Sequence, residues 1–192
     1  MIEEIKNKAL DEKVPIIKDD GLSFLLDLIK ENRCKEILEL GTAVGYSAMQ
    51  MASLDADIHI DTIEKNEEMY KQAIANIKDN GLEGQIDVHF MPIEEYETNR
   101  KYDFIFVDAA KAQYHRYMDQ FLDNLKADGL MVFDNMVFHG LIYEEEIKSR
   151  SLRSLVRKIK EFRDFVHNDE RFDIMMYDHI GDGILVLRRR NK

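Results

Sequence analysis

The stretch EILELGTAVGYS at residues 36–47 decides the fold class of this chain. It reads as a short apolar strand, a turn with glycines at Gly41 and Gly45, and the start of a helix. The turn lacks the tighter G-x-G-x-x-G spacing of dinucleotide-binding sheets, and no Lys-Ser or Lys-Thr pair follows, which excludes a phosphate-binding P-loop. We therefore predict an α/β protein with a parallel sheet, in which ligands bind beyond the carboxyl ends of the strands.

Strand-length apolar segments alternate with segments of helical period along the rest of the chain. Strands are predicted at 36–40, 58–63, 86–90, 102–108, 130–134, 172–177 and 183–187. Helices are predicted at 2–13, 20–32, 46–54, 65–80, 113–126 and within 144–168. The near-continuous apolar strands fit a mostly parallel sheet with helices on both faces, and the short connection 178–182 makes the last two strands an antiparallel edge pair. The link at 94–100 is too short to assign.

The composition fits one globular domain over residues 1–192, with 45% hydrophobic and 34% charged residues. A net charge of −11 argues against a protein whose whole surface binds nucleic acid, but it allows a local basic face. Cys34 is the single cysteine, which excludes a disulfide framework and a Cys-based zinc site. We find no signal-peptide pattern and no apolar run of the ~20 residues that a membrane helix needs, so we expect a soluble, cytoplasmic protein.

Two acidic residues accompany the glycine turn. Glu39, inside the strand end, would repel a pyrophosphate and suits a ligand with a cationic or ammonium group. Glu64 ends the second strand, where a carboxylate can accept hydrogen bonds from both hydroxyls of a ribose. The alternative is an ordinary strand-to-helix turn with a solvated Glu.

Oxygen-bearing side chains follow the fourth and fifth strands. Asp108, Asp134 and Asn135 emerge at the carboxyl ends of predicted neighbours, with Lys111 nearby. Two carboxylates and an amide oxygen favour Mg²⁺, with Mn²⁺ or Ca²⁺ as further candidates, over zinc. Asp134 and Asn135 can both reach one ion only if the backbone turns there. The alternative is that these residues only cap turns and helices.

The strand, glycine turn and acid together resemble the S-adenosylmethionine-binding half of the class I methyltransferases, which have a Rossmann-like fold. The resemblance implies that the matching residues wrap the cofactor, with 61–63 beneath the adenosine. The implied cofactor residues are Glu39, Gly41, Thr42, Gly45, Ser47, Glu64, Pro92, Ile93 and Asp108.

The motifs VDAAK at 107–111 and FDN at 133–135 narrow the resemblance to the cation-dependent O-methyltransferases of the catechol and caffeoyl-CoA type. It implies that Asp108, Asp134 and Asn135 hold the divalent ion and that Lys111, beside Asp108 in the catalytic centre, takes the substrate proton. The likeness extends from Val14-Pro15-Ile16 to IGDG at 180–183.

The short length and these motifs look most like the bacterial branch, which includes the tRNA 5-hydroxyuridine methyltransferase. The implied reaction is conversion of 5-hydroxyuridine to 5-methoxyuridine at the tRNA wobble position. A small catechol-like phenol is the alternative substrate, and a non-catalytic cofactor-binding module is the alternative class. The resemblance also implies a homodimer, with N-terminal helices in 1–32 covering the site.

A basic segment follows the predicted metal strand. Residues 148–163 carry seven basic side chains and one acid, a local excess of +6. The second basic cluster is 188–190. Both suit tRNA phosphates; the alternative is a solvated helix face. Lys13 and Lys18 flank Pro15 and are further candidates for substrate contact.

Overall fold

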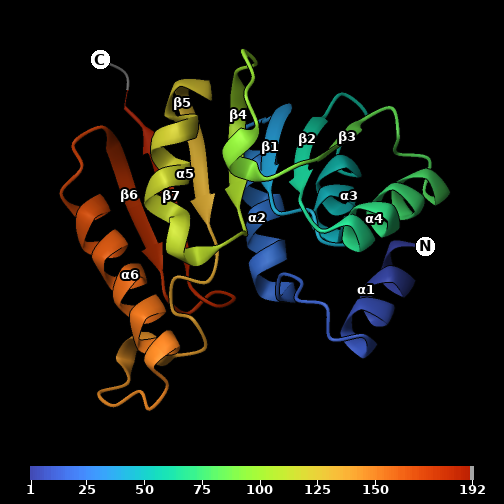
Figure 1. Ribbon diagram of the computed structural model, residues 1–192. Coiled ribbons are helices and arrows are strands. Elements are labelled where there is room, and N and C mark those ends of the chain that lie inside the picture. The colour runs from blue at the N-terminus through green and yellow to red at the C-terminus, as the bar shows by residue number, and fades with distance from the viewer. Residues whose placement is uncertain (191–192) are drawn as a thin grey trace.

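A computed structural model describes residues 1–190. It contains one seven-stranded sheet with the order β3-β2-β1-β4-β5-β7-β6 (Figure 1). The strands are β1 Glu36–Leu40, β2 His59–Glu64, β3 Ile86–Phe90, β4 Tyr102–Val107, β5 Leu125–Phe133, β6 Phe172–Tyr177 and β7 Ile184–Arg189. The first five are parallel, and β7 runs antiparallel to both of its neighbours. The predicted mostly parallel seven-stranded sheet is confirmed.

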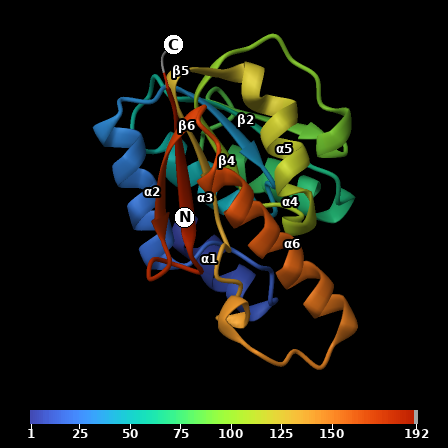
Figure 2. The same cartoon turned by 90° about the vertical axis from the view of Figure 1, so that its left-hand side faces the viewer.

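Helices cover both faces of the sheet (Figure 2). They are α1 Ile2–Asp11, α2 Asp19–Glu31, α3 Tyr46–Ala52, α4 Glu67–Asp79, α5 Tyr114–Phe121 and α6 Arg150–His167. Buried residues of α1 to α4 pack together on one face, and those of α5 and α6 pack on the other. No helix among the described residues is both long enough and apolar enough to span a bilayer.

The boundary between the fifth helix and the fifth strand differs from the prediction. The helix predicted to reach residue 126 ends at Phe121, a 3₁₀ turn follows at Leu122–Asn124, and β5 begins at Leu125 rather than at 130. The cause is pairing: Leu125 is buried opposite Tyr102 on β4, and the ladder is irregular before it resumes at Phe104. The unassigned link between β3 and β4 contains only a 3₁₀ turn at Ile93–Glu95.

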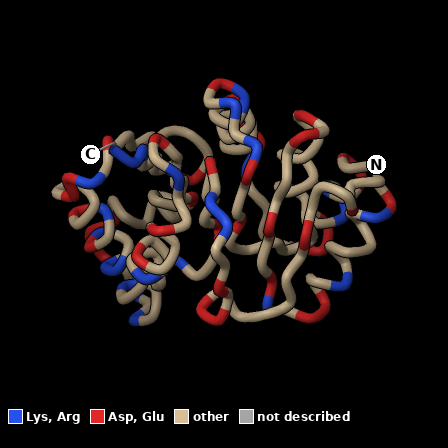
Figure 3. The backbone as a smooth tube through the Cα atoms, turned by 90° about the horizontal axis from the view of Figure 1, so that it is seen from above, with Lys and Arg blue, Asp and Glu red and all other residues tan. Residues whose placement is uncertain are grey.

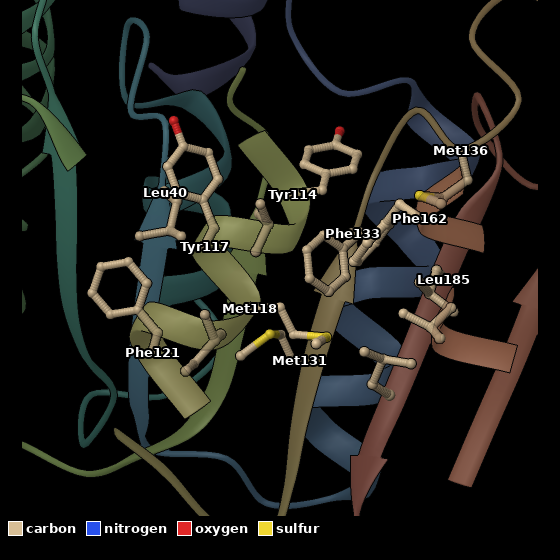
Figure 4. Close-up of a cluster of buried hydrophobic side chains, with 14 of the residues drawn as sticks. Leu40, Tyr114, Tyr117, Met118, Phe121, Met131, Phe133, Met136, Phe162 and Leu185 are labelled. Carbon is tan, nitrogen blue, oxygen red and sulfur yellow. The ribbon is translucent and has the colours of Figure 1, made fainter. Parts of the chain in front are cut away.

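An aromatic cluster connects α5 and α6 to β5 (Figure 4). The ring centroids of Tyr114, Phe133 and Phe162 lie 4.9–5.6 Å apart, in tilted or edge-to-face pairs of the kind that aromatic rings favour. The Tyr114 hydroxyl also donates a hydrogen bond to the Asp134 carbonyl oxygen at 2.7 Å. This packing fixes the end of β5, from which Asp134 and Asn135 emerge.

Candidate active site

A cavity of about 570 Å³ lies at the carboxyl edge of the sheet, beyond the ends of β1, β4 and β5. Most of the predicted site residues line it, namely Gly41, Thr42, Ser47, Glu64, Ile93, Asp108, Lys111, Asp134 and Asn135. From the N-terminal region the wall contains residues 14–18, the connection between α1 and α2, rather than the helices themselves. Lys18 belongs to this connection, whereas Lys13 is not in the wall.

Gly41 is where the turn after β1 passes closest to β4. Its φ of +106° lies in a region that side chains other than glycine rarely adopt, and an added Cβ would lie 2.2 Å from the Asp108 carbonyl oxygen. The glycine therefore lets the turn after β1 approach the strand end that carries Asp108. This brings the predicted cofactor residues of the turn close to the acidic side of the cavity, which contains Asp108 and Asp134.

Substituting Gly41 with Ala is expected to destabilise the fold by about 3–5 kcal/mol, because backbone strain and a backbone clash add together. Urea unfolding would measure this loss. Gly84→Ala is the matched control, since a Cβ at Gly84 meets no atom within 4 Å. A free energy of unfolding equal in the two variants would contradict the steric role of Gly41.

Glu39 is fully buried and lies behind the turn, outside the cavity wall. Its Oε1 accepts a hydrogen bond from the Ser47 hydroxyl and its Oε2 from the Thr62 hydroxyl, each at 2.5 Å. Burial raises the pKa of Glu39 to about 7, although these hydrogen bonds oppose the shift. The structure thus shows Glu39 connecting the start of α3, through Ser47, with β2, through Thr62.

The raised pKa of Glu39 predicts a pH-dependent stability. The unfolded chain releases this proton near pH 4.5 and the folded chain only near pH 7, so stability is lost as the pH rises between these values. The contribution of Glu39 is about 3 kcal/mol. Urea unfolding from pH 4.5 to 8 should show a shallower decline in Glu39→Gln than in the wild type. An identical decline would contradict the assignment.

Glu64 is held at the cavity wall by two backbone amides. Its Oε2 accepts a hydrogen bond from the Ala43 nitrogen at 2.9 Å, and its Oε1 accepts one from the Asn66 nitrogen at 2.8 Å. Glu64 is half-buried and lines the cavity together with Ala43. The carboxylate is therefore fixed beside the glycine turn, as a residue that binds ribose hydroxyls has to be.

Besides Glu39, four residues of the implied cofactor region lie outside the cavity wall, namely Gly45, Asp61, Thr62 and Pro92. Gly45 caps the start of α3 in a left-handed conformation with φ +82°, which favours glycine. Pro92 precedes the 3₁₀ turn and does not line the cavity, whereas Ile93 and Glu94 of the turn do. Asp61, expected beneath the adenosine, instead accepts hydrogen bonds at 2.8 Å from His89, Arg100 and Tyr102.

The backbone turns directly after β5, as two adjacent ligands require. The Asp134 nitrogen donates a hydrogen bond to the Val107 carbonyl oxygen at 3.2 Å, so β4 and β5 end side by side. Asn135 then adopts a left-handed conformation with φ +59°, and both Asp134 and Asn135 line the cavity with Asp108. Lys111 lies shortly after β4, in the 3₁₀ turn Lys111–Gln113, and its Nζ is 6.0 Å from the centre of the Phe138 ring.

The acidic side of the cavity has unbalanced negative charge. Burial, followed by repulsion from Asp108, raises the pKa of Asp134 to about 7. Burial also raises the pKa of Asp108, with Lys111 opposing the shift and Asp182 adding to it. Within residues 1–190 no three His, Cys, Asp or Glu side chains are arranged to hold a metal ion, so an ion here would also need the Asn135 amide oxygen. The oxygen donors and the excess charge fit a divalent cation.

Asp182 was not predicted as a site residue, although it lies within the quoted motif at 180–183. It is buried at the cavity wall, and its Oδ1 is 3.6 Å from the Lys18 Nζ. The sequence feature that could have identified Asp182 is its place between Gly181 and Gly183, next to a predicted strand. The sequence does not show that this turn folds back beside Asn135.

The two basic clusters differ in their surroundings. Five basic side chains of this region form no ion pair or hydrogen bond with any residue in the described part of the chain: Arg150, Arg153, Lys158 and Lys160 on α6, and Lys148 just before it. Arg163 instead donates two hydrogen bonds to Asp178 at 2.8 Å. Figure 3 shows Lys and Arg positions gathered on the side of the molecule where α6 lies.

The C-terminal arginines all make contacts within the chain. Arg188 donates to the Asn32 side chain at 2.7 Å, Arg189 donates to the carbonyl oxygens of the 3₁₀ turn and of β5, and Arg190 donates to Asp173 at 2.8 Å. These bonds tie β7 to its neighbours. Of the two clusters, α6 is therefore the one with side chains left available for a partner.

The fold is that of a methyltransferase. Residues 1–190 match the family model described as O-methyltransferase. The chain is 33% identical over 186 residues to a caffeoyl-CoA O-methyltransferase of Populus kitakamiensis, covering 92% of this chain and 77% of the relative. A Staphylococcus aureus structure described as a caffeoyl-CoA O-methyltransferase superposes with a TM-score of 0.94 at 33% identity, covering 98% of this chain and 91% of that one.

The chain therefore belongs to the O-methyltransferase family, and the predicted enzyme class, an S-adenosylmethionine-dependent O-methyltransferase, is confirmed. The fold is shared more widely. A Bacillus cereus O-methyltransferase in complex with S-adenosylhomocysteine has a TM-score of 0.83 at 22% identity, covering 98% of this chain and 90% of that one.

Proposed function

We propose that the enzyme transfers a methyl group from S-adenosylmethionine to a hydroxyl that lies beside a second oxygen, with Mg²⁺ as cofactor, and that its substrate is 5-hydroxyuridine in tRNA. The observation that carries the proposal is the meeting of Asp108, Asp134, Asn135 and Lys111 in one cavity with the turn after β1. 5-Hydroxyuridine has a C5 hydroxyl beside the C4 carbonyl, which is the chelating pair that such a site requires.

Each part of the cavity has a role in this chemistry. Gly41, Thr42 and Ser47 bind the methionine end of the cofactor, and Glu64 accepts hydrogen bonds from its ribose. Asp108, Asp134 and the Asn135 amide hold the cation, which when bound lowers the pKa of the substrate hydroxyl. Lys111, in its neutral amine form, accepts the proton of that hydroxyl at its Nζ. The walls hold oxygen, carbon and sulfur in line, and this alignment supplies much of the acceleration.

The basic face of α6 supports a nucleic-acid substrate. Arg150, Arg153, Arg157 and Lys160 recur at three- and four-residue spacing, and all four are exposed. The helix packs against the 3₁₀ turn of Lys111 and against the one at Leu141–Tyr143. A tRNA whose backbone follows this face would therefore have its target base near the cavity.

The decisive experiment uses tRNA from a strain that lacks this gene. It is incubated with the protein, S-adenosylmethionine and Mg²⁺, digested, and read by mass spectrometry, with a chelator control. We expect 5-hydroxyuridine to become 5-methoxyuridine and the conversion to stop with chelator. A triple substitution of Arg150, Arg153 and Arg157 by Gln should reduce conversion and its salt dependence. The control replaces Lys8, Lys30 and Lys78 by Gln, which changes the net charge equally.

A small catechol-like phenol is the second candidate, because the plant relatives are named for caffeoyl-CoA. Methyl transfer to a catechol without any conversion of tRNA would favour it over the first proposal. In that case the α6 triple variant should be as active as the wild type.

A further inference from the structure

The turn between β6 and β7 joins the acidic side of the cavity through two backbone hydrogen bonds. The Met136 nitrogen donates to the Gly183 carbonyl oxygen at 2.9 Å, and the Val137 nitrogen donates to the Asp182 carbonyl oxygen at 2.8 Å. Gly183 permits this approach, because an added Cβ would lie 2.5 Å from the Val137 side chain. The turn is thus a fixed neighbour of the segment that follows Asp134.

The contacts of the Asp182 carboxylate within 3.6 Å are with nitrogen atoms, and its charge also raises the pKa values of Asp108 and Asp134. Asp182 is 5% exposed; its Oδ1 accepts a hydrogen bond from the His139 backbone nitrogen at 2.7 Å, and its Oδ2 lies 3.5 Å from the Asn135 Nδ2. The Lys18 ammonium is 3.6 Å from Oδ1, and the His139 ring nitrogen Nδ1 is 3.5 Å from Oδ2. A carboxylate accepts hydrogen bonds but cannot donate them, whereas an amide has one donating and one accepting end.

We infer that Asp182 is a positioning residue that orients the Asn135 side chain. By attracting the amide nitrogen, it leaves the amide oxygen on the side turned away from Asp182, where it is free to bind a divalent cation. The inference rests on the proposed function, because it assigns Asn135 to the cation site. Partners behind the ligands of a metal commonly change its affinity by about 10–100-fold.

The substitution Asp182→Asn separates this role from simple packing. The new side chain keeps the size of Asp, and its oxygen can still accept from His139, but its nitrogen would then face the Asn135 nitrogen. Two donors cannot bond, so the Asn135 amide should turn and present its nitrogen to the cation site. Asp182→Ala removes the acceptor without reversing the amide. A packing role predicts the opposite order, with Ala more harmful than Asn.

The test measures Mn²⁺ dissociation constants by electron paramagnetic resonance, without cofactor or substrate. We expect weaker binding in Asp182→Ala and a loss of about 10-fold or more in Asp182→Asn. The double variant Asn135→Asp/Asp182→Asn exchanges the acid and the amide between the two positions, and it should restore most of the affinity. Asp173→Asn is the control, because Asp173 is exposed on β6 and pairs with Arg190. Urea unfolding would confirm that each variant is folded.

The inference can fail in two distinguishable ways. If the wild type binds Mn²⁺ and folded Asp182→Asn binds it equally well, or if the double variant is not rescued, Asp182 does not position Asn135 and the proposed function stands. If the folded wild type binds no Mn²⁺, the cation-dependent function fails and the inference fails with it.

Discussion

Replacing Asp134 with Asn is expected to lower the rate of methyl transfer by about 10³-fold at subsaturating Mg²⁺. Asp134 is one of the two carboxylates in the proposed cation site. It is 2% exposed, so solvent cannot compensate for the loss of its charge. Initial rates measured over a range of Mg²⁺ concentrations should show a weaker cation dependence in the variant. Its affinity for S-adenosylmethionine should change little, since Glu64 and the turn after β1 are untouched.

The same substitution should have the opposite effect on stability without the cation. The pKa of Asp134 is about 7 in the folded chain, against 3.8 for an ordinary Asp, so the folded state loses stability as the pH rises from 4 to 7. At pH 8 without divalent ions, Asp134→Asn should therefore be more stable than the wild type, by about 2–4 kcal/mol. Excess Mg²⁺ should stabilise only the wild type. A variant that is destabilised without Mg²⁺ and still fully active would contradict the assignment.

Substituting Lys111 with Met is expected to reduce turnover by about 10²–10⁴-fold, the usual contribution of a general base. Lys111 is half-buried at the cavity wall, and its charge interacts with Asp108. Cofactor binding, measured by calorimetry, should persist. The rate of methyl transfer should be recorded across pH 6–10, because the loss of a base removes the pH dependence that the base causes.

Lys111→Arg distinguishes a base from a charge. Arginine keeps the positive charge beside Asp108 but does not release its proton in proteins. If Lys111 accepts the substrate proton, the Arg variant should be nearly as slow as the Met variant. A fully active Arg variant would leave Lys111 only an electrostatic role, and a fully active Met variant would exclude both roles.

The sequence predicts the sheet well because each central strand is a continuous apolar run that can be recognised locally. Apolar runs such as 104–107 are buried on both faces, so the pattern alone identifies them. The boundary at Leu125 was predicted wrongly because Phe121, Leu122 and Leu125 continue a helical spacing. Pairing with β4, which is a tertiary interaction, decides where the helix ends and the strand begins.

Site residues can be predicted from the sequence where they stand directly after parallel strands, and less well elsewhere. Asp108, Asp134 and Asn135 follow β4 and β5, and parallel strands bring such ends together. Asp182 belongs to a hairpin whose position depends on β7 entering between β5 and β6, which no local pattern indicates. The arginines at 188–190 form a basic cluster in sequence, yet each has its own partner within the fold.

The position of β7 has a consequence for how the enzyme matures. The ribosome makes β6 before β7, yet β6 joins the sheet only through β7. A nascent chain that ends at β6 can therefore assemble the four strands β1 to β4 with β5, including the turn that faces the cofactor, while β5 has an open edge. The wall that contains Asp182 forms only after the hairpin inserts. Cofactor binding should thus arise earlier in synthesis than the complete form of the proposed cation site.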